Sequence, residues 1–584
     1  MPGPAPNAAL AFMPEGYSTQ HGKLMGRHSA TEGFLRAMIR HAGVDRHVAY
    51  ALASGAGQQF APMAKALGAT RPVAVIPPQA IAQVAQLGTL FMPGPNIGNL
   101  AGLRALARAD RSFSLTGVTY TLSSLAAMSG VTALLTSPVR EWDAVVCISH
   151  SARRMMEALL DAEQARLAAR LGATRFPRPQ LPVIPLGIET GSFVFRNAIR
   201  HEWRQRIGAG PDDFVLLHHG RVSWHAKAHH WPMLAALGRV SAELSRSAAG
   251  LGRSAAGLGR CAAGLPGRKI HLLMAGWSAN QGQEDALQQQ AQALCPEVKL
   301  FRAGGLEPER RPGVWAAADA FVLLSDNIQE TYGLAVVEAM AAGLPVLVSD
   351  WDGFRDTVRD GIDGFRVPTI MAGPGTAPDL AMAHAAKAVD YDHHLAASTQ
   401  LVAVDVAATA EALQRLVTNR DARLAMGAAA QSRARQEFDW SAVMPRYQAL
   451  WRELQAIREA APATIQTAWP MPEMADPTQV FAAWPTSVLS PDTRLALDPA
   501  APAAGLEAAL RLPAAVHPKP EAATVQRLAL LLAAVPPGGA IPAQALHDLA
   551  AEPDRAAAGR DILWLLKTGF LRALPTPSDS LAGA

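Results

Sequence analysis

Residues 321–368 read FVLLSDNIQETYGLAVVEAMAAGLPVLVSDWDGFRDTVRDGIDGFRVP, and this stretch decides the fold class. An apolar run of strand length ends at Ser325, and the polar loop after it carries Glu330. A helix rich in small residues is predicted over residues 332–342, because Gly343 is typical of a residue that ends a helix. A second apolar run follows at once. Strand, loop, helix and strand in this order indicate a parallel α/β unit.

The loop and the helix start in this stretch are suited to a phosphate group. The first turn of a helix exposes free backbone N–H groups, and the helix dipole adds partial positive charge there. Gly333 allows the backbone to approach a ligand closely. The Glu330 carboxylate lies in the approach loop, where it can meet hydroxyl groups beyond the phosphate. Glu338 lies more than a turn into the helix, and its carboxylate can accept hydrogen bonds from two vicinal hydroxyls, such as those of a ribose.

The same alternation of apolar runs and amphipathic stretches extends over most of the chain. Buried strands are predicted at residues 8–13, 47–53, 72–76 and 144–149, and again at 214–218, 270–275, 298–301, 320–325, 345–349 and 364–367. Helices are predicted at residues 31–41, 151–171, 232–244 and 284–294. A proline-punctuated segment, LPVIPLG at residues 181–187, separates the two series. The predicted fold class is α/β, with two Rossmann-like lobes facing a cleft and ligands at the carboxyl ends of the strands.

These patterns divide the chain into four parts. Residues 1–188 are the predicted N-terminal lobe, and residues 189–455 are the predicted C-terminal lobe. Residues 456–521 are rich in Ala and Pro, which indicates a linker. Residues 522–584 regain helical periodicity and end with a short apolar run, so a small, mostly helical appendage is expected. A winged-helix-like module and a plain helical appendage both remain open, although few basic residues are available there for DNA.

A tandem repeat interrupts the C-terminal lobe. It reads RSAAGLG, RSAAGLG, RCAAGLP over residues 246–266. Each full unit carries two glycines and lacks the paired apolar positions of a coiled coil, and three such units are too few for a solenoid. The repeat is therefore interpreted as an expansion of a surface loop, without a catalytic role.

Composition limits the class of protein. The 584 residues are 49% hydrophobic and 17% charged, which excludes wholesale disorder. The net charge of +4 is too even for a dedicated nucleic-acid binder. Residues 1–190 carry 17 Lys+Arg and 10 Asp+Glu, a net charge of +7. This surplus suits an anionic lipid or an acidic acceptor, while an ordinary arginine-rich surface is the simpler interpretation. Three unclustered cysteines exclude a disulfide framework.

The expected location is the cytoplasm. No apolar run reaches the roughly 18 to 20 residues that a membrane span needs. The first residues, MPGPAPNAALAFMPEGY, lack the basic region of a signal peptide. Peripheral contact with the inner face of the membrane stays open.

The motif residues resemble those of a known family. Glu330 and Glu338 have seven residues between them. Together with Gly333 and the segment AMAAGLPV at residues 339–346, they resemble the E-x7-E region of family 4 retaining glycosyltransferases of GT-B fold (glycosyltransferase group 1). The Asp-Gly pair at residues 352–353 also falls in the family's order.

Further segments extend the resemblance over most of residues 1–455. HGRVS at residues 219–223, followed by Lys227, resembles the family's glycine-arginine…lysine motif. VIPLGI at residues 183–188 resembles the segment that joins the two lobes. FDW at residues 438–440 resembles the late element at which the chain returns toward the first lobe.

The resemblance implies an enzyme that transfers a sugar from a nucleotide diphosphate sugar to a glycan or glycolipid hydroxyl with retention of configuration. The implied catalytic residues are Glu330, Lys227 and Arg221, and the implied donor-binding residues are Glu338, Gly333, Tyr332, Leu334, Gly220, Gly22, Gly26 and Tyr120. Arg221 and Lys227 would stabilise the negative charge that develops on the leaving diphosphate. No cofactor and no metal are expected, because these two cations and the helix amides take the place of a divalent ion.

One departure from the family supports an alternative. Tyr120 stands where many members carry a histidine near the transferred sugar, and a phenol cannot carry a cationic charge at neutral pH. A nucleotide-sugar-binding protein without turnover is therefore a second hypothesis. A scaffold that acts through its C-terminal appendage is a third. A phosphorylase would need a cofactor lysine, and none is identified.

Two other clusters contain residue types that can bind a metal. Asp350-Trp351-Asp352 has a D-x-D spacing, but it follows the phosphate-binding helix, so a role of Asp350 in loop structure is favoured. Asp356 is expected to cap the short helix that ends at Gly361. Five histidines lie near Lys227, at His218, His219, His225, His229 and His230. Zinc is their less favoured interpretation, since no carboxylate or thiolate pattern accompanies them.

Overall fold

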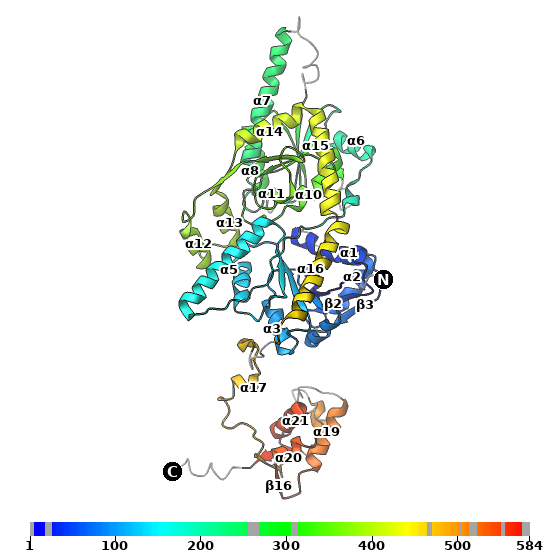
Figure 1. Cartoon of the computed structure of the whole chain (residues 1–584), viewed down its shortest axis with the longest axis vertical. Helices are drawn as coiled ribbons and strands as arrows, with labels where there is room; N and C mark the ends of the chain where they lie inside the picture. The colour runs from blue at the N-terminus through cyan, green and yellow to red at the C-terminus, as the bar shows by residue number, and fades with distance from the viewer. Residues whose placement is uncertain are drawn as a thin grey trace. The chain divides into compact units, whose positions relative to one another are not determined.

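The computed structural model describes residues 5–17, 26–254, 268–278, 280–304, 313–463, 470–502, 505–512, 522–550 and 555–574. The chain divides into two compact units, residues 1–474 and 475–584. Figure 1 shows the helices and strands of both units and labels some of them.

The first lobe is built on a six-stranded parallel sheet in the order β3-β2-β1-β4-β5-β6. Its strands are β1 (Ala9–Phe12), β2 (His47–Ala51), β3 (Val73–Ile76), β4 (Thr89–Phe91), β5 (Ser114–Val118) and β6 (Ala144–Val146). Its helices are α1 (Gly26–His41), α2 (Phe60–Ala66), α3 (Gly98–Leu106), α4 (Leu125–Thr132) and α5 (His150–Leu171). The strand order reverses between β1 and β4, as in a Rossmann-like lobe.

The second lobe repeats this plan. Its sheet is parallel in the order β12-β11-β10-β7-β8-β9. The strands are β7 (Phe214–His219), β8 (Ile270–Ala275), β9 (Lys299–Ala303), β10 (Ala320–Leu323), β11 (Val346–Ser349) and β12 (Gly364–Val367). The helices around it include α6 (Asn197–Arg206), α7 (Trp231–Ser254), α8 (Gln281–Leu294), α9 (Gly313–Ala317), α10 (Leu334–Ala341), α11 (Phe354–Thr357), α14 (Val406–Thr418) and α15 (Arg420–Arg433). The prediction of two Rossmann-like lobes is confirmed.

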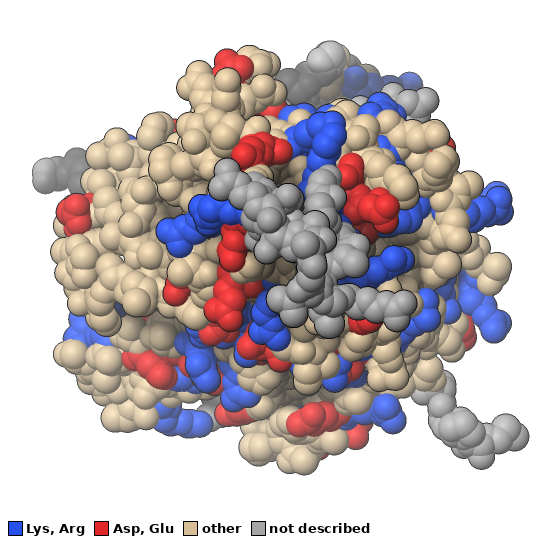
Figure 2. All heavy atoms as spheres, turned by 90° about the horizontal axis from the view of Figure 1, so that it is seen from above, with Lys and Arg blue, Asp and Glu red and all other residues tan. Residues whose placement is uncertain are grey.

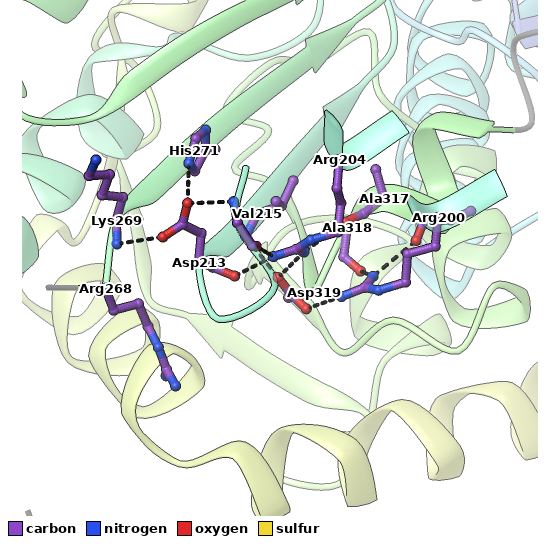
Figure 3. A network of polar contacts seen from close by, with 12 residues as sticks. Arg200, Arg204, Asp213, Val215, Arg268, Lys269, His271, Ala317, Ala318 and Asp319 are labelled. Carbon is purple, nitrogen blue, oxygen red and sulfur yellow. Dashed lines mark hydrogen bonds and ion pairs between the residues drawn. The ribbon is translucent and has the colours of Figure 1, made fainter. Parts of the chain in front are cut away.

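A polar network fastens the amino-terminal edge of the second sheet (Figure 3). The Asp319 carboxylate, just before β10, accepts hydrogen bonds from Arg200 and Arg204 of α6 and from the backbone N–H of Val215 in β7, at 2.6, 3.0 and 2.9 Å. Asp213 contacts His271 at 3.0 Å. These residues lie at the opposite edge from the carboxyl ends of the strands, so they hold the lobe together without facing its ligand side.

Helix α16 (Trp440–Ala460) carries the chain from the second lobe back to the first. The backbone of Ile188, in the linker, exchanges hydrogen bonds with Phe438 and Trp440 at 2.8 and 3.1 Å. Trp440 and Tyr447 then pack edge-on against Phe34 of α1. The largest core cluster accordingly contains residues of both lobes, which makes the lobes parts of one unit.

The repeat is helical at its start, contrary to the prediction of a loop. Helix α7 continues to Ser254, ten residues beyond its predicted end, and takes in the first copy of the repeat. The reason is local: Ala, Leu, Arg and Ser favour an established helix enough to carry it through two glycines. Residues 255–267 lie outside the described part of the chain.

The second unit is a small three-stranded antiparallel sheet in the order β16-β15-β17, covered by helices. Its elements are α17 (Pro477–Val480), β15 (Arg494–Leu497), α18 (Gly505–Arg511), α19 (Ala522–Ala533), β16 (Ala540–Pro542), α20 (Ala543–His547), α21 (Arg555–Lys567) and β17 (Leu571–Ala573). Leu495 of β15 is buried in the same cluster as Leu528 and Ile562. The central strand therefore comes from residues 456–521, the segment expected as a linker.

The apolar character of the helices and the charge of the surface concern how the protein meets its environment. Among the described residues, no helix combines the length and the apolar character needed to cross a membrane. In the view of Figure 2, Lys and Arg side chains are interspersed with Asp and Glu. The exposed surface in that view is therefore mixed in charge.

Candidate nucleotide-sugar site

The predicted motif residues gather at the carboxyl ends of the second lobe's strands. Gly220 and Arg221 follow β7, Glu330 lies in the loop after β10, and the Asp352 loop follows β11. The amino-terminal end of α5 and the loop before α4 meet them from the first lobe, through hydrogen bonds from Ser149 to Asp352 and between Ser123 and Tyr391. The site thus lies between the lobes.

Arg221 is held by two acceptors. Its Nη2 atom donates to the carbonyl oxygen of Ala226 at 3.0 Å and to Oε1 of Gln329 at 2.7 Å. Both hydrogens on Nη2 are therefore used. The guanidinium also lies 5.7 Å from the ring centroid of Trp277. Burial lowers the pKa of Arg221, and the charge of Asp392 opposes that shift, so the side chain keeps its positive charge near neutrality.

Lys227 and Glu330 form an ion pair in the cleft. The ammonium group contacts the Glu330 carboxylate, and the two side chains are 20% and 10% exposed. Burial alone would raise the pKa of Glu330, but the charge and hydrogen bond of Lys227, with the backbone N–H groups of Tyr332 and Thr331, hold it below its usual value. Glu330 is thus an anion at neutral pH, beside the cation expected to bind phosphate.

Gly333, the residue immediately before α10, has a conformation that favours glycine. Its φ and ψ are 84° and 65°, in the left-handed region. A Cβ atom on it would lie 2.2 Å from Cε1 of Phe354. The Tyr332 side chain is buried, and its hydroxyl donates to the carbonyl oxygen of Leu186 at 2.8 Å. Tyr332 therefore anchors the helix start to the interlobe linker, and only its backbone remains for a donor.

Glu338 lines an open pocket of about 290 Å³ to which both lobes contribute. The second lobe supplies Leu334 and Glu338 from α10, and α1 of the first lobe supplies Ser29, Glu32, Gly33 and Arg36. The lining is completed by Gly187, Ile188, Glu189, Ser192, Phe193 and Trp440. Burial raises the pKa of Glu338 to about 7, and the positive charge of Lys227 opposes the shift. The carboxyl group therefore titrates near neutrality.

The site residues predicted in the first lobe, Gly22, Gly26 and Tyr120, differ in their surroundings. Gly22 lies outside the described residues. Gly26 is the first residue of α1, with open space around it. The Tyr120 hydroxyl accepts a hydrogen bond from Thr31 of α1 at 3.4 Å. Burial raises the pKa of Tyr120 to about 12, so the side chain is a neutral phenol at pH 7.

The Asp352 loop contacts the other lobe. The Ser149 hydroxyl donates to Asp352 at 3.2 Å, and the backbone N–H of His150 donates to Asp356 at 2.7 Å. The expectation that Asp356 caps its own short helix is wrong: α11 begins after Gly353, and the Asp356 carboxylate instead meets the amino-terminal end of α5. Burial, followed by the charge of Glu330, raises the pKa of Asp352 to about 8.

The two clusters of metal-binding residue types have other partners. Asp350 pairs with Arg355 and Arg366 at 3.6 and 3.5 Å, which agrees with a role in loop structure. The rings of His218 and His230 pack edge to face, and burial lowers the pKa of His230 to about 4. Within the described ranges, no three His, Cys, Asp or Glu side chains are grouped so that they could hold a metal ion.

Several site residues were missed by sequence reasoning. Gln329, Tyr391 and Ser123 form a hydrogen-bonded path to Arg221, and Glu32 and Arg36 line the cavity. None of them belongs to a motif. Gln329 adjoins Glu330 and could have been suspected from that position, whereas the others are brought in by topology alone.

Comparisons with known proteins relate one part of the chain to a family. Residues 258–370 match the model described as glycosyl transferases group 1. D-inositol 3-phosphate glycosyltransferase of Nocardia farcinica (strain IFM 10152) is 29% identical over 211 residues, which are 35% of this chain and 40% of that protein. Phosphatidyl-myo-inositol mannosyltransferase of Mycobacterium leprae (strain TN) is 36% identical over 100 residues, 17% of this chain and 25% of that protein. The chain thus spans less than half the length of these relatives.

Solved structures are similar over a larger share of the chain. The complex of Anabaena Alr3699/HepE with UDP and glucose has 16% identity and a TM-score of 0.45, and the match covers 76% of this chain and 100% of that one. Sucrose-phosphate synthase from Thermosynechococcus elongatus has 15% identity and a TM-score of 0.45, and covers 77% and 100%.

Proposed function

We propose that this protein is a glycosyltransferase that moves a sugar from a nucleotide diphosphate sugar to an acceptor hydroxyl with retention of configuration. One observation carries the proposal. Arg221, the Lys227–Glu330 pair and the start of α10 all follow carboxyl ends of strands in the second lobe. Glu338, on which the charge of Lys227 acts, lines a pocket to which both Rossmann-like lobes contribute. The match of residues 258–370 to a glycosyltransferase family supports it.

Each group has a place in donor binding. Arg221, Lys227 and the backbone N–H groups at the start of α10 would bind the diphosphate, because fixed cations and helix amides favour phosphate oxygens. Glu338 would accept hydrogen bonds from the ribose hydroxyls. Glu330 would contact the donor sugar while its charge is balanced by Lys227. No metal is required, since these groups supply the positive charge that a divalent ion would otherwise bring.

The reaction would take place on one face of the sugar. The bond between the anomeric carbon and the phosphate oxygen breaks, and its electrons leave with the diphosphate. The acceptor oxygen bonds to the same face of the anomeric carbon, and its proton passes to the departing phosphate oxygen. Arg221 and Lys227 stabilise the charge that grows on that oxygen. Contact between the lobes would exclude water and so limit hydrolysis of the donor.

The acceptor would be a glycan or glycolipid of the cell surface. Two relatives are named for transfer to D-inositol 3-phosphate and to phosphatidyl-myo-inositol, both of which offer ring hydroxyls beside a phosphate. The net charge of +7 over residues 1–190 suits such an anionic acceptor, or the surface of an anionic membrane that carries it. Peripheral contact at the inner face of a membrane is part of this proposal.

Release of nucleotide from UDP-, GDP- and ADP-sugars tests the proposal. The wild-type protein should release nucleotide from at least one donor. Lys227→Ala and Glu330→Gln should lower that rate by at least about 100-fold, as for other groups that stabilise charge in a transition state. The matched control is Lys65→Ala, because Lys65 is an exposed lysine on α2 far from these motifs in sequence. Wild-type rates in both site variants would reject the proposal.

A nucleotide-sugar-binding protein without turnover is the second candidate. The neutral Tyr120 phenol favours it, because it lacks the positive charge of a protonated histidine. This candidate predicts that calorimetry detects binding of a sugar nucleotide while no nucleotide is released. Turnover would exclude it.

A further inference from the structure

An excursion from the second lobe carries a residue into the site. After β12 the chain forms β13 (Thr369–Met371), α12 (Pro378–Ala385), α13 (Tyr391–Thr399) and β14 (Val402–Val404) before it reaches α14. Strands β13 and β14 pair antiparallel, apart from the six-stranded sheet. Figure 1 shows α12 and α13 in yellow-green. No sequence motif marks this excursion.

Helix α13 is fixed against the loop that precedes Glu330. The Asp390 side chain caps its first turn by accepting from the backbone N–H of His393 at 2.8 Å. Near its end, the buried Thr399 hydroxyl accepts from Nδ2 of Asn327 at 2.7 Å. Asn327 also accepts from the backbone N–H of Gln329 at 2.8 Å. The first residue of α13, Tyr391, therefore has a defined position beside Gln329.

The Tyr391 hydroxyl joins the two lobes. It lies 2.7 Å from Oγ of Ser123, in the loop before α4 of the first lobe. On the other side it accepts a hydrogen bond from Nε2 of Gln329 at 3.4 Å. Burial raises the pKa of Tyr391, so the hydroxyl keeps its proton near neutrality and can donate it to Ser123.

The path continues to the diphosphate-binding cation. The same Gln329 amide that donates to Tyr391 accepts through Oε1 from Nη2 of Arg221 at 2.7 Å. The amide can serve both neighbours only in one orientation, because its oxygen accepts and its nitrogen donates. Arg221, which can only donate, fixes the amide oxygen toward itself, and the Tyr391 hydroxyl is the second contact that holds the Gln329 side chain in that position.

We propose that Tyr391 is a positioning residue that couples contact between the lobes to the orientation of Arg221 toward the leaving diphosphate. The inference rests on the proposed transferase function and adds a residue from outside its motifs. Without the Tyr391 hydroxyl, the Gln329 amide keeps only its contact with Arg221, so the acceptor for the guanidinium is held less firmly. The donor still meets Lys227 and α10, so the loss falls on turnover more than on binding.

The experiment compares Tyr391→Phe, Ser123→Ala and the double variant in the full-length protein. Nucleotide release gives kcat for the sugar nucleotide that the wild-type protein turns over, and calorimetry gives the Kd of that donor. Each single variant should lower kcat by about 3- to 10-fold, the scale of one hydrogen bond, and change Kd by less than about 2-fold. The double variant should be no slower than Tyr391→Phe, because both changes break one path.

The matched control is Ser398→Ala. This change removes from the same helix a hydroxyl that donates to the backbone carbonyl oxygen of His394 at 2.8 Å. Its kcat should equal that of the wild-type protein. A Tyr391→Phe variant with wild-type kcat, or one that loses only thermal stability, would overturn the inference while leaving the proposed function intact. A wild-type protein that releases no nucleotide from any donor would overturn both.

Discussion

Glu338 offers a direct measurement at the scale of a single residue. Burial raises the pKa of its carboxyl group to about 7, so the group gains its negative charge as the pH rises through neutrality. A charged carboxylate accepts stronger hydrogen bonds from ribose hydroxyls than a neutral acid does. Donor affinity should therefore increase by about 3- to 10-fold between pH 5.5 and 8.5, measured by calorimetry with an intact sugar nucleotide.

The control for this prediction is a second carboxyl group. Glu338→Gln should bind the donor more weakly at high pH and should flatten the profile. Two other carboxyl groups near the site have raised pKa values, Asp352 at about 8 and Asp326, in the loop before Glu330, at about 7. If Glu338 causes the increase in donor affinity around pH 7, the Asp352→Asn variant should still show that increase. A profile that stays unchanged in Glu338→Gln would contradict the assignment.

Single residues also show how much of the candidate site can be predicted from the sequence. Arg221, Lys227, Glu330 and Glu338 could be predicted because each belongs to a motif with fixed spacing along one lobe. Tyr391 could not, because its role depends on a hydroxyl of Ser123, which lies 268 positions away in the chain. Such pairs form only when both lobes are folded.

At the scale of the element, Gly333 and Gly343 bracket α10 and make a matched pair. Both have positive φ angles, 84° and 77°. An added Cβ at Gly333 would lie 2.2 Å from the Phe354 ring, whereas at Gly343 the nearest atom is Nε2 of Gln431 at 3.4 Å. Gly343→Ala should cost about 1–2 kcal/mol of unfolding free energy for the backbone alone. Gly333→Ala should cost about 1–3 kcal/mol more for the overlap.

Urea denaturation and donor titration check this pair together. Gly333→Ala should also lose donor affinity, because the overlap displaces the amides at the start of α10. Gly343→Ala should retain it. Equal stability and equal affinity in the two variants would show that the start of α10 is no more constrained than its end.

Several elements have the bounds that the sequence predicts, or nearly so. Strand β8 and strand β12 have the predicted ends, and α5 and α10 differ from their predictions by a residue or two. Strand β4 has three residues and β5 contains Ser, Thr and Gly, so neither forms an apolar run that stands out. Strand β15 escaped notice because four residues in a Pro-rich segment form a strand only through pairing with β16 and β17.

At the scale of the whole molecule, the separation into two units predicts what a truncation does. Residues 1–474 contain both lobes, α16 and every residue assigned to the site. A protein ending at residue 474 should fold and should bind the donor with an affinity within about 3-fold of the full chain, since ordinary surface changes alter binding little. Calorimetry on both proteins checks this. Donor binding that requires residues 475–584 would instead support a functional role of the C-terminal unit in the site.

The two-lobe plan itself followed from the sequence because strand and helix alternate twice with a linker between them. The helical start of the repeat and the three-stranded sheet of the second unit could not be predicted from the sequence. Each of them depends on neighbouring segments in the folded chain.

Thermal stability with a panel of UDP-, GDP- and ADP-sugars, in the presence of EDTA, tests the central claim most directly. Binding to the folded state stabilises it by an amount that grows with the logarithm of ligand concentration over Kd, and this raises the melting temperature. One class of donor should raise it in the wild-type protein, with EDTA present throughout, and the shift should disappear in Arg221→Ala. A protein whose stability responds to no donor, or whose response survives Arg221→Ala unchanged, would contradict the assignment of this cleft to a nucleotide sugar.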